Sequence, residues 1–137
     1  MLIILEKNNP TFDSQTNTIA MEHLFSYGTL QLEKVQLETF GRILKGEKVQ
    51  LRKYQLGETE IKDQSVIEKS GKNIHPIAKF TGNERDGISG VLFEITYEEL
   101  LQSDEYEVDE YERVKVVFDN NISGWVYVCR ETNKLNL

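Results

Sequence analysis

The stretch LFSYGTL, residues 24–30, decides the predicted fold because it joins the end of a buried strand to a tight glycine turn. Residues 22–27 predict a strand that buries Leu24. Gly28 ends this strand, and a positive φ is expected there because glycine adopts it without steric cost. The chain is therefore expected to reverse direction directly after a core strand.

The backbone of this turn is a candidate binding element. Consecutive N–H groups that leave a strand ladder can hold a carboxylate or a developing oxyanion. The residues that would supply them are Tyr27, Gly28, Thr29 and Leu30. The alternative is an ordinary strand-to-helix turn whose amides are bound to water.

The rest of the chain is predicted to be rich in short strands, with two short helices. A helix is expected at residues 32–40, closed by Gly41, and a second at 97–103 or slightly beyond, where Thr96 and Glu99 form a capping box. Short strands are expected at residues 42–44, 49–56, 58–61, 66–68, 74–80, 88–95, 112–118 and 124–130, the last two as a hairpin. This order predicts the α+β class and a small mixed β-barrel with two short helices.

The second informative stretch is DEYEVDEYER, residues 104–113. Tyr106 and Tyr111 are expected to anchor this stretch to the core. Some of the neighbouring carboxylates would then point toward the protein and others toward solvent. Arg113 is expected to pair with Asp104 or with Glu107. Most acidic runs are simply solvated surface, and that is the alternative here.

Composition and charge narrow the function. The chain has 137 residues, which suits one domain, and a net charge of −7 with scattered Lys and Arg, which argues against a nucleic-acid partner. The single cysteine, Cys129, favours a reducing compartment, and no signal-like or membrane-spanning run is present. We expect a cytoplasmic protein with a small-molecule partner and no membrane association. Composition does not predict the oligomeric state.

Neither a metal nor a cofactor is predicted. The acidic run could supply oxygen ligands to Ca²⁺ or Mg²⁺, but its spacing does not fit an EF-hand loop. The two histidines and the cysteine are too far apart in the chain to indicate a zinc site.

Together, the two motifs resemble the gamma-glutamylcyclotransferase family, in its AIG2-like branch. That family combines a YGTL or YGSL turn with a Glu inside a DxYExxxYxR stretch. The resemblance extends over most of residues 21–130 and also rests on FGR at 40–42, YQL at 54–56, GVLF at 90–93 and WVYV at 125–128. It implies the same α+β barrel fold and no cofactor.

The resemblance implies an enzyme in which the substrate attacks itself. The α-amine of a γ-glutamyl amine, amino acid or peptide closes on the side-chain carbonyl, expels the leaving amine and forms 5-oxoproline. Glu107 matches the catalytic position and would act as general acid and base. The turn at Tyr27, Gly28, Thr29 and Leu30 would bind substrate. Tyr127 could complete the pocket wall, with ordinary core packing as the alternative.

Two further alternatives stay open. A non-catalytic module that binds a small carboxylated metabolite would use the same pocket. Residues 1–20 are interpreted either as an N-terminal extension, disordered or added by an upstream start, or as an extra edge strand near Leu2, with the domain itself at residues 21–137.

Overall fold

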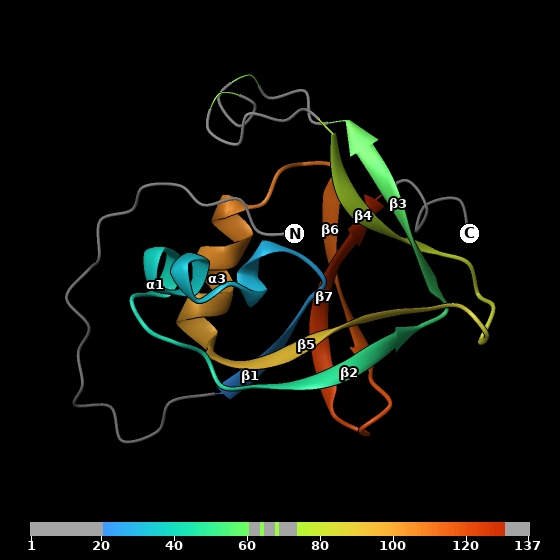
Figure 1. Ribbon diagram of the computed structural model, residues 1–137, viewed down its shortest axis with the longest axis horizontal. Helices are drawn as coiled ribbons and strands as arrows, with labels where there is room; N and C mark the ends of the chain where they lie inside the picture. The colour runs from blue at the N-terminus through green and yellow to red at the C-terminus, as the bar shows by residue number, and fades with distance from the viewer. Residues whose placement is uncertain (1–20, 61–63, 65–67, 69–73, 131–137) are drawn as a thin grey trace.

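The computed structural model describes residues 21–60, 64, 68 and 74–130 (Figure 1). Its elements are, in chain order, β1 (Met21–Ser26), η1 (Thr29–Gln31), α1 (Glu33–Phe40), β2 (Gly46–Arg52), β3 (Tyr54–Glu60), β4 (Ile74–Phe80), β5 (Gly87–Thr96), α3 (Tyr97–Tyr106), β6 (Tyr111–Val117) and β7 (Ser123–Cys129). The α+β prediction is confirmed. The predicted strand at 66–68 and the segment 1–20 lie outside the described residues, apart from Glu68.

The seven strands form one curled sheet in the order β2-β5-β1-β7-β4-β3, with β6 paired to β7. β7 pairs with three other strands, β6, β1 and β4. Its pairing with β6 is antiparallel, whereas it meets β1 in parallel at Leu24 and Trp125 and meets β4 in parallel at Ala78 and Val128. β1 and β4 therefore follow one another along the same side of β7, and this arrangement curls the sheet into the predicted barrel-like form.

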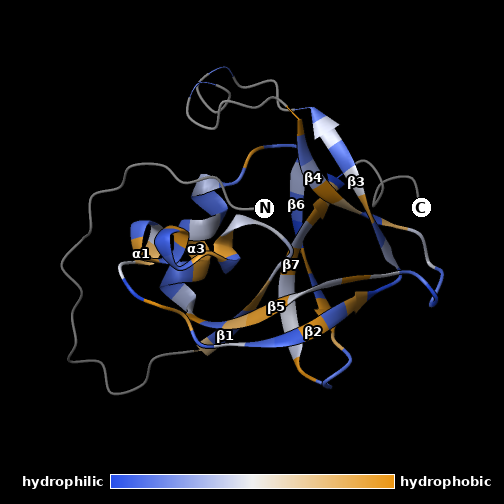
Figure 2. Ribbon diagram, in the orientation of Figure 1, coloured by the Kyte–Doolittle hydropathy of each residue, from blue (hydrophilic) through white to orange (hydrophobic). Residues whose placement is uncertain are grey.

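Two hydrophobic clusters lie on the two sides of this curled sheet. The first core cluster packs the sheet against the helices and contains Leu24, Leu30, Val35, Leu44, Ile77, Phe93, Ile95, Leu100, Tyr111 and Tyr127. The second core cluster lies inside the curl and contains Phe25, Val49, Leu51, Tyr54, Ala78, Ile88, Leu92, Phe118, Val126 and Val128. Figure 2 shows the hydrophobic residues along the central strands of the sheet. Side chains alternate along β7, with Tyr127 in the first core cluster and Val126 and Val128 in the second.

Both helices begin and end much as predicted. Gly41 closes α1 in the left-handed conformation with φ 73° and donates its N–H to the Leu37 carbonyl. Thr96 and Glu99 form the capping box of α3, which runs on to Tyr106. Both helices lie at one end of the curled sheet in Figure 1. Asp104, in the last turn of α3, binds Arg113 of β6 and Tyr127 of β7, so this helix end lies close to both strands.

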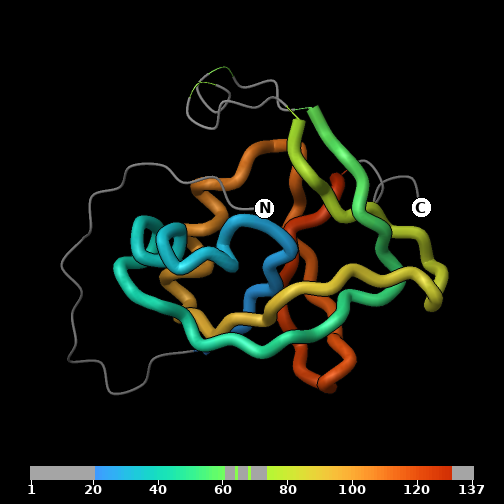
Figure 3. The backbone as a smooth tube through the Cα atoms, viewed as in Figure 1, coloured from blue at the N-terminus to red at the C-terminus, as the bar shows by residue number. Residues whose placement is uncertain are grey.

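Two predicted strands were wrong. Residues 42–44 form no strand, and Arg42 instead makes a bidentate ion pair with Glu99, with N–O distances of 2.9 and 2.7 Å. The single strand predicted at 49–56 is divided at Lys53, which has a φ of 72°. The chain turns there because β2 pairs with β5 whereas β3 pairs with β4. The tube in Figure 3 follows this change of direction.

The hairpin of β6 and β7 is confirmed, with Tyr111 opposite Cys129 and Arg113 opposite Tyr127. Among the described residues, no helix has the length and apolar character needed to cross a membrane.

Candidate functional site

Glu107 caps the C-terminus of α3, where its N–H donates to the Ser103 carbonyl at 3.1 Å. Its φ of −80° and ψ of 147° are extended, so the chain leaves the helix at this residue. Both carboxylate oxygens of Glu107 are buried. The carboxylate that the family resemblance selected from the acidic run, that of Glu107, is therefore shielded from water.

Three tyrosine side chains lie near enough to this carboxylate to be affected by its charge, and two of them, Tyr111 and Tyr127, line one pocket with it. The pKa values of Tyr27, Tyr111 and Tyr127 are all raised well above the usual tyrosine range, mainly by burial and also by the negative charge of Glu107. The hydroxyls consequently stay protonated at neutral pH and act as hydrogen-bond donors. Glu107, Tyr27 and Tyr127, which the sequence predicted as site residues, are thus brought together.

Each tyrosine donates its proton to a group other than Glu107. The Tyr27 hydroxyl donates to the Tyr127 carbonyl at 2.7 Å, and the Tyr111 hydroxyl donates to the Pro76 carbonyl at 2.6 Å. The Tyr127 hydroxyl donates to Asp104 Oδ1 at 2.8 Å. Because a phenol has one proton, all three are committed in this arrangement.

Tyr27 also has a structural role that the sequence did not reveal. Its hydroxyl accepts the Ala78 N–H at 3.0 Å while it donates to the Tyr127 carbonyl. The side chain thereby links β4 to β7 just beyond the end of β1, where the strand ladder is interrupted. No local sequence pattern could have predicted this link, because the two partners lie 51 and 100 residues away.

Asp104 lies in the last turn of α3 and receives a second set of donors. Arg113 Nε and Nη2 bind Asp104 Oδ1 and Oδ2 at 2.7 and 2.9 Å. The guanidinium also lies over the Trp125 ring, 4.1 Å from its centroid. Of the two partners predicted for Arg113, the structure selects Asp104, and the pair fastens the end of α3 to β6 and β7.

A pocket of about 350 Å³ opens beside these groups. Its lining residues include Asp104, Glu107, Tyr111, Arg113, Trp125 and Tyr127. The pocket combines carboxylates, a guanidinium and aromatic walls, which suits a small polar ligand carrying both an amine and a carboxylate.

The YGTL turn differs from its prediction. Gly28 has a φ of −141°, so the positive φ expected there was wrong. The Gly28 N–H donates to Ser26 Oγ at 3.2 Å, and the Gln31 N–H donates back to the Gly28 carbonyl at 3.2 Å. The Leu30 side chain is buried in the first core cluster. Part of the turn's hydrogen-bonding capacity is therefore used internally, while Thr29 and Leu30 are the first two residues of η1.

Two glutamines that the sequence analysis overlooked hold this turn in place. Gln31 Nε2 donates to the Ser26 carbonyl at 2.8 Å. The buried Gln36 donates through Nε2 to the Leu30 carbonyl at 2.9 Å and accepts the Leu44 N–H through Oε1 at 2.8 Å. The available signal was a glutamine directly after Val35 and three residues before Thr39, within the predicted helix.

We expect Gln36→Leu to destabilise the fold by about 1–3 kcal/mol, because the Leu30 carbonyl and the Leu44 N–H would lose a buried partner. Urea unfolding measures this change. Gln102→Leu, on α3, is the matched control, because that side chain is only half-buried and is expected to change the stability much less. Equal effects of the two substitutions would show that Gln36 does not bridge these segments.

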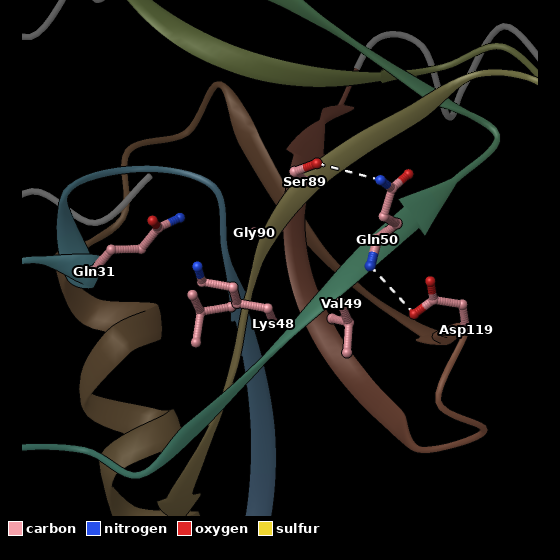
Figure 4. A pocket seen from close by; sticks show the side chains of 8 residues that line it. Gln31, Lys48, Val49, Gln50, Ser89, Gly90 and Asp119 are labelled. Atoms are coloured by element: carbon pink, nitrogen blue, oxygen red, sulfur yellow. Dashed lines mark hydrogen bonds between the residues drawn. The ribbon is translucent and has the colours of Figure 1, made fainter.

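A second pocket, of about 460 Å³, lies along β2 and β5 (Figure 4). Gln31, Lys48, Gln50, Ser89 and Asp119 contribute its polar groups, and Gln50 Nε2 donates to Ser89 Oγ at 3.3 Å. Of the described residues, Glu107 does not line it, and residues 27–30 line neither this pocket nor the one beside Glu107. It is therefore separate from the Glu107 pocket.

Within the described part of the chain, no group of three or more His, Cys, Asp or Glu side chains is arranged to hold a metal ion. The polar groups that line the pocket beside Glu107 are two tyrosines, two aspartates, a second glutamate and two arginines, a set that favours proton transfer and hydrogen bonding.

Comparison with solved structures shows where this fold occurs. The solution structure of At3g28950.1 from Arabidopsis thaliana is similar, with a TM-score of 0.62 and 20% identity over 88% of this chain and 68% of that chain. The solution structure of At5g39720.1 from Arabidopsis thaliana has the same TM-score of 0.62 and 20% identity, over 86% of this chain and 74% of that chain. At this identity, the likeness shows the fold alone.

A comparison with curated proteins found no match. The family model for "Gamma-glutamyl cyclotransferase, AIG2-like" matches residues 24–137, which include both the YGTL turn and the acidic run. The chain belongs to this gamma-glutamyl cyclotransferase, AIG2-like family.

Proposed function

We propose that this protein is a γ-glutamylcyclotransferase-type enzyme that releases 5-oxoproline from a γ-glutamyl amine, amino acid or peptide, with Glu107 as general acid and base. Family membership supports the reaction type. The observation that carries the assignment of Glu107 is its buried carboxylate, near three tyrosines whose protons are donated elsewhere.

In this cluster we assign the role of the base to Glu107. Tyr27, Tyr111 and Tyr127 remain protonated because burial raises their pKa values. Asp104 is held by Arg113 and by the Tyr127 hydroxyl. A base must act at this point, because the substrate's α-amine is mostly protonated at neutral pH and cannot attack in that form.

The reaction then needs no protein nucleophile. Glu107 takes a proton from the α-ammonium, and the amine nitrogen attacks the γ-carbonyl carbon to form the five-membered lactam. Glu107 returns this proton to the leaving nitrogen, and the bond between the γ-carbon and that nitrogen breaks. The ring nitrogen gives up its second proton, through Glu107, to the released amine, which departs as an ammonium ion. Holding amine and carbonyl in ring-closing geometry favours the step, because oriented intramolecular reactions reach effective molarities of about 10⁵–10⁸ M.

We assign substrate contact to the turn formed by Tyr27, Gly28, Thr29 and Leu30, whose main chain would bind the α-carboxylate or the developing oxyanion. Tyr127 is assigned to the wall of the pocket, where it is one of the lining residues. Trp125 and Arg113 line the same pocket and are placed to meet the polar end of the substrate.

The test is 5-oxoproline release from a panel of γ-glutamyl amino acids, γ-glutamyl amines and glutathione, followed by chromatography. We expect release from at least one class, and the class identifies the leaving amine. The panel is run on the wild type and on Glu107→Gln. Glu105→Gln is the matched control for that variant, since Glu105 is exposed on α3 and its substitution should leave the rate unchanged. If the folded protein binds a γ-glutamyl ligand but releases no 5-oxoproline from any of them, it is a binding module and the proposal fails.

A further inference from the structure

We propose that Asp104 is a positioning residue: it holds the Tyr127 hydroxyl and the Arg113 guanidinium away from Glu107 and thereby sets the pH range in which Glu107 acts as a base. The inference deepens the proposed function and rests on it for its catalytic meaning. The hydrogen bonds that Tyr127 and Arg113 donate to Asp104 do not depend on the proposed reaction.

Asp104 is close to saturated by these two donors. Oδ1 accepts from Arg113 Nε at 2.7 Å and from the Tyr127 hydroxyl at 2.8 Å, while Oδ2 accepts from Arg113 Nη2 at 2.9 Å. Hydrogen bonds to an ionised carboxylate are roughly twice as strong as those between neutral groups. The hydrogen bond from Tyr127 to the Asp104 carboxylate is therefore stronger than one to a neutral acceptor would be.

The groups that face Glu107 come from every element around it. Tyr27 comes from just beyond β1, Tyr111, Glu112 and Arg113 from β6, and Tyr127 from β7, while Asp104 of α3, Asp109 and Arg130 line the same pocket as Glu107. The charge of Glu107 contributes to the raised pKa of each of the three tyrosines, after burial. Tyr27 and Tyr111 donate to main-chain carbonyls at 2.7 and 2.6 Å. Tyr127 is the exception, because a side chain receives its proton, and that side chain can be replaced.

Arg113 is the other donor that Asp104 restrains. It lines the same pocket as Glu107, and its Nη1 is buried without a hydrogen-bond partner while Nε and Nη2 bind Asp104. A guanidinium is charged at all accessible pH values, so its position decides how strongly it stabilises a neighbouring carboxylate.

Removing the Asp104 carboxylate has three consequences with the same sign. The Tyr127 hydroxyl becomes available to Glu107, the Arg113 charge is released beside it, and one negative charge near it disappears. Each of these favours the ionised form of Glu107. Glu107 would then hold its proton only at lower pH and would be a weaker base for the substrate's ammonium group.

The experiment is an NMR titration of isotope-labelled glutamate side-chain carboxyls in the full chain, with the Glu107 signal assigned by its loss in Glu107→Gln. In Asp104→Ala we expect the titration midpoint of that signal to fall by about 1 pH unit or more. Glu105→Ala is the control for charge alone, because Glu105 is the exposed neighbour on the same helix. A midpoint in Asp104→Ala that moves no further than in Glu105→Ala would overturn the proposal.

A double variant separates the two donors. In Asp104→Ala combined with Tyr127→Phe, the midpoint is expected to return part of the way, because the hydroxyl that turned toward Glu107 is gone. If Asp104→Ala does not fold, Asp104→Asn keeps one acceptor oxygen for Tyr127 and loses both the charge and the second oxygen that Arg113 binds. Its midpoint should fall by more than in the Glu105→Ala control, and an unchanged or higher midpoint contradicts the proposal.

The titration needs no turnover, so the two proposals fail separately. A midpoint that falls as expected, in a protein that releases no 5-oxoproline, would remove the proposed reaction and leave the positioning role of Asp104. Where turnover is measured, the low-pH limb of kcat should move to lower pH together with the NMR midpoint. A rate that falls with an unmoved limb would indicate a merely structural loss.

Discussion

Glu107→Gln is expected to fold and to bind a γ-glutamyl ligand while its 5-oxoproline release falls by about 10²–10⁴-fold, the usual contribution of a general acid–base group. The amide has nearly the shape of the carboxylate but cannot take the proton from the substrate's ammonium group. Both carboxylate oxygens of Glu107 are buried, so a water molecule cannot easily take over the role of the base in the variant.

The informative measurement is kcat alongside the ligand dissociation constant. A lost kcat with an unchanged dissociation constant indicates that Glu107 acts in the transition state, whereas a parallel loss of binding would assign it to holding the ligand. Full cyclising activity in Glu107→Gln would show that the proposed mechanism is wrong. Glu110→Gln, in the same acidic run, should be nearly silent.

Gly90→Ala is expected to destabilise the fold by about 3 kcal/mol, at the upper end of the cost of overpacking a core. A Cβ at Gly90 would lie 2.4 Å from the Phe25 ring and 2.4 Å from the Ser26 carbonyl oxygen. The ring cannot move away easily because it stacks on Phe118 with centroids 5.0 Å apart. The oxygen belongs to the β1 backbone, directly before Tyr27.

Gly87→Ala, on the same strand, is the matched control for Gly90→Ala. A Cβ there first meets Gln50 Oε1 at 2.8 Å, which is the end of a flexible side chain that can rotate away. Urea unfolding of the two variants should therefore give a large loss for Gly90 and a small one for Gly87. If both cost the same, the loss would reflect glycine's strand propensity and not the close approach of β5 to β1.

Much of the secondary structure could be predicted because its signals are local. The capping box of Thr96 and Glu99, the left-handed Gly41 and the hairpin of β6 and β7 each depend on residues close together in the chain. The corner at Lys53 could not be predicted, because it exists only where β2 leaves β5 and β3 joins β4. A residue with positive φ that is not glycine carries no clear sequence signal.

The candidate site also combines features that have a local sequence signal with features that depend on residues far apart in the chain. The sequence by itself determined the strand that buries Leu24, the helix ends and, through the family resemblance, the choice of Glu107 among many carboxylates, since these rest on local patterns and a recognisable motif. Only the tertiary structure decided that Gly28 is extended and that Arg113 binds Asp104. It also decided where three tyrosine protons go, because hydrogen-bond direction depends on partners that folding brings from distant strands.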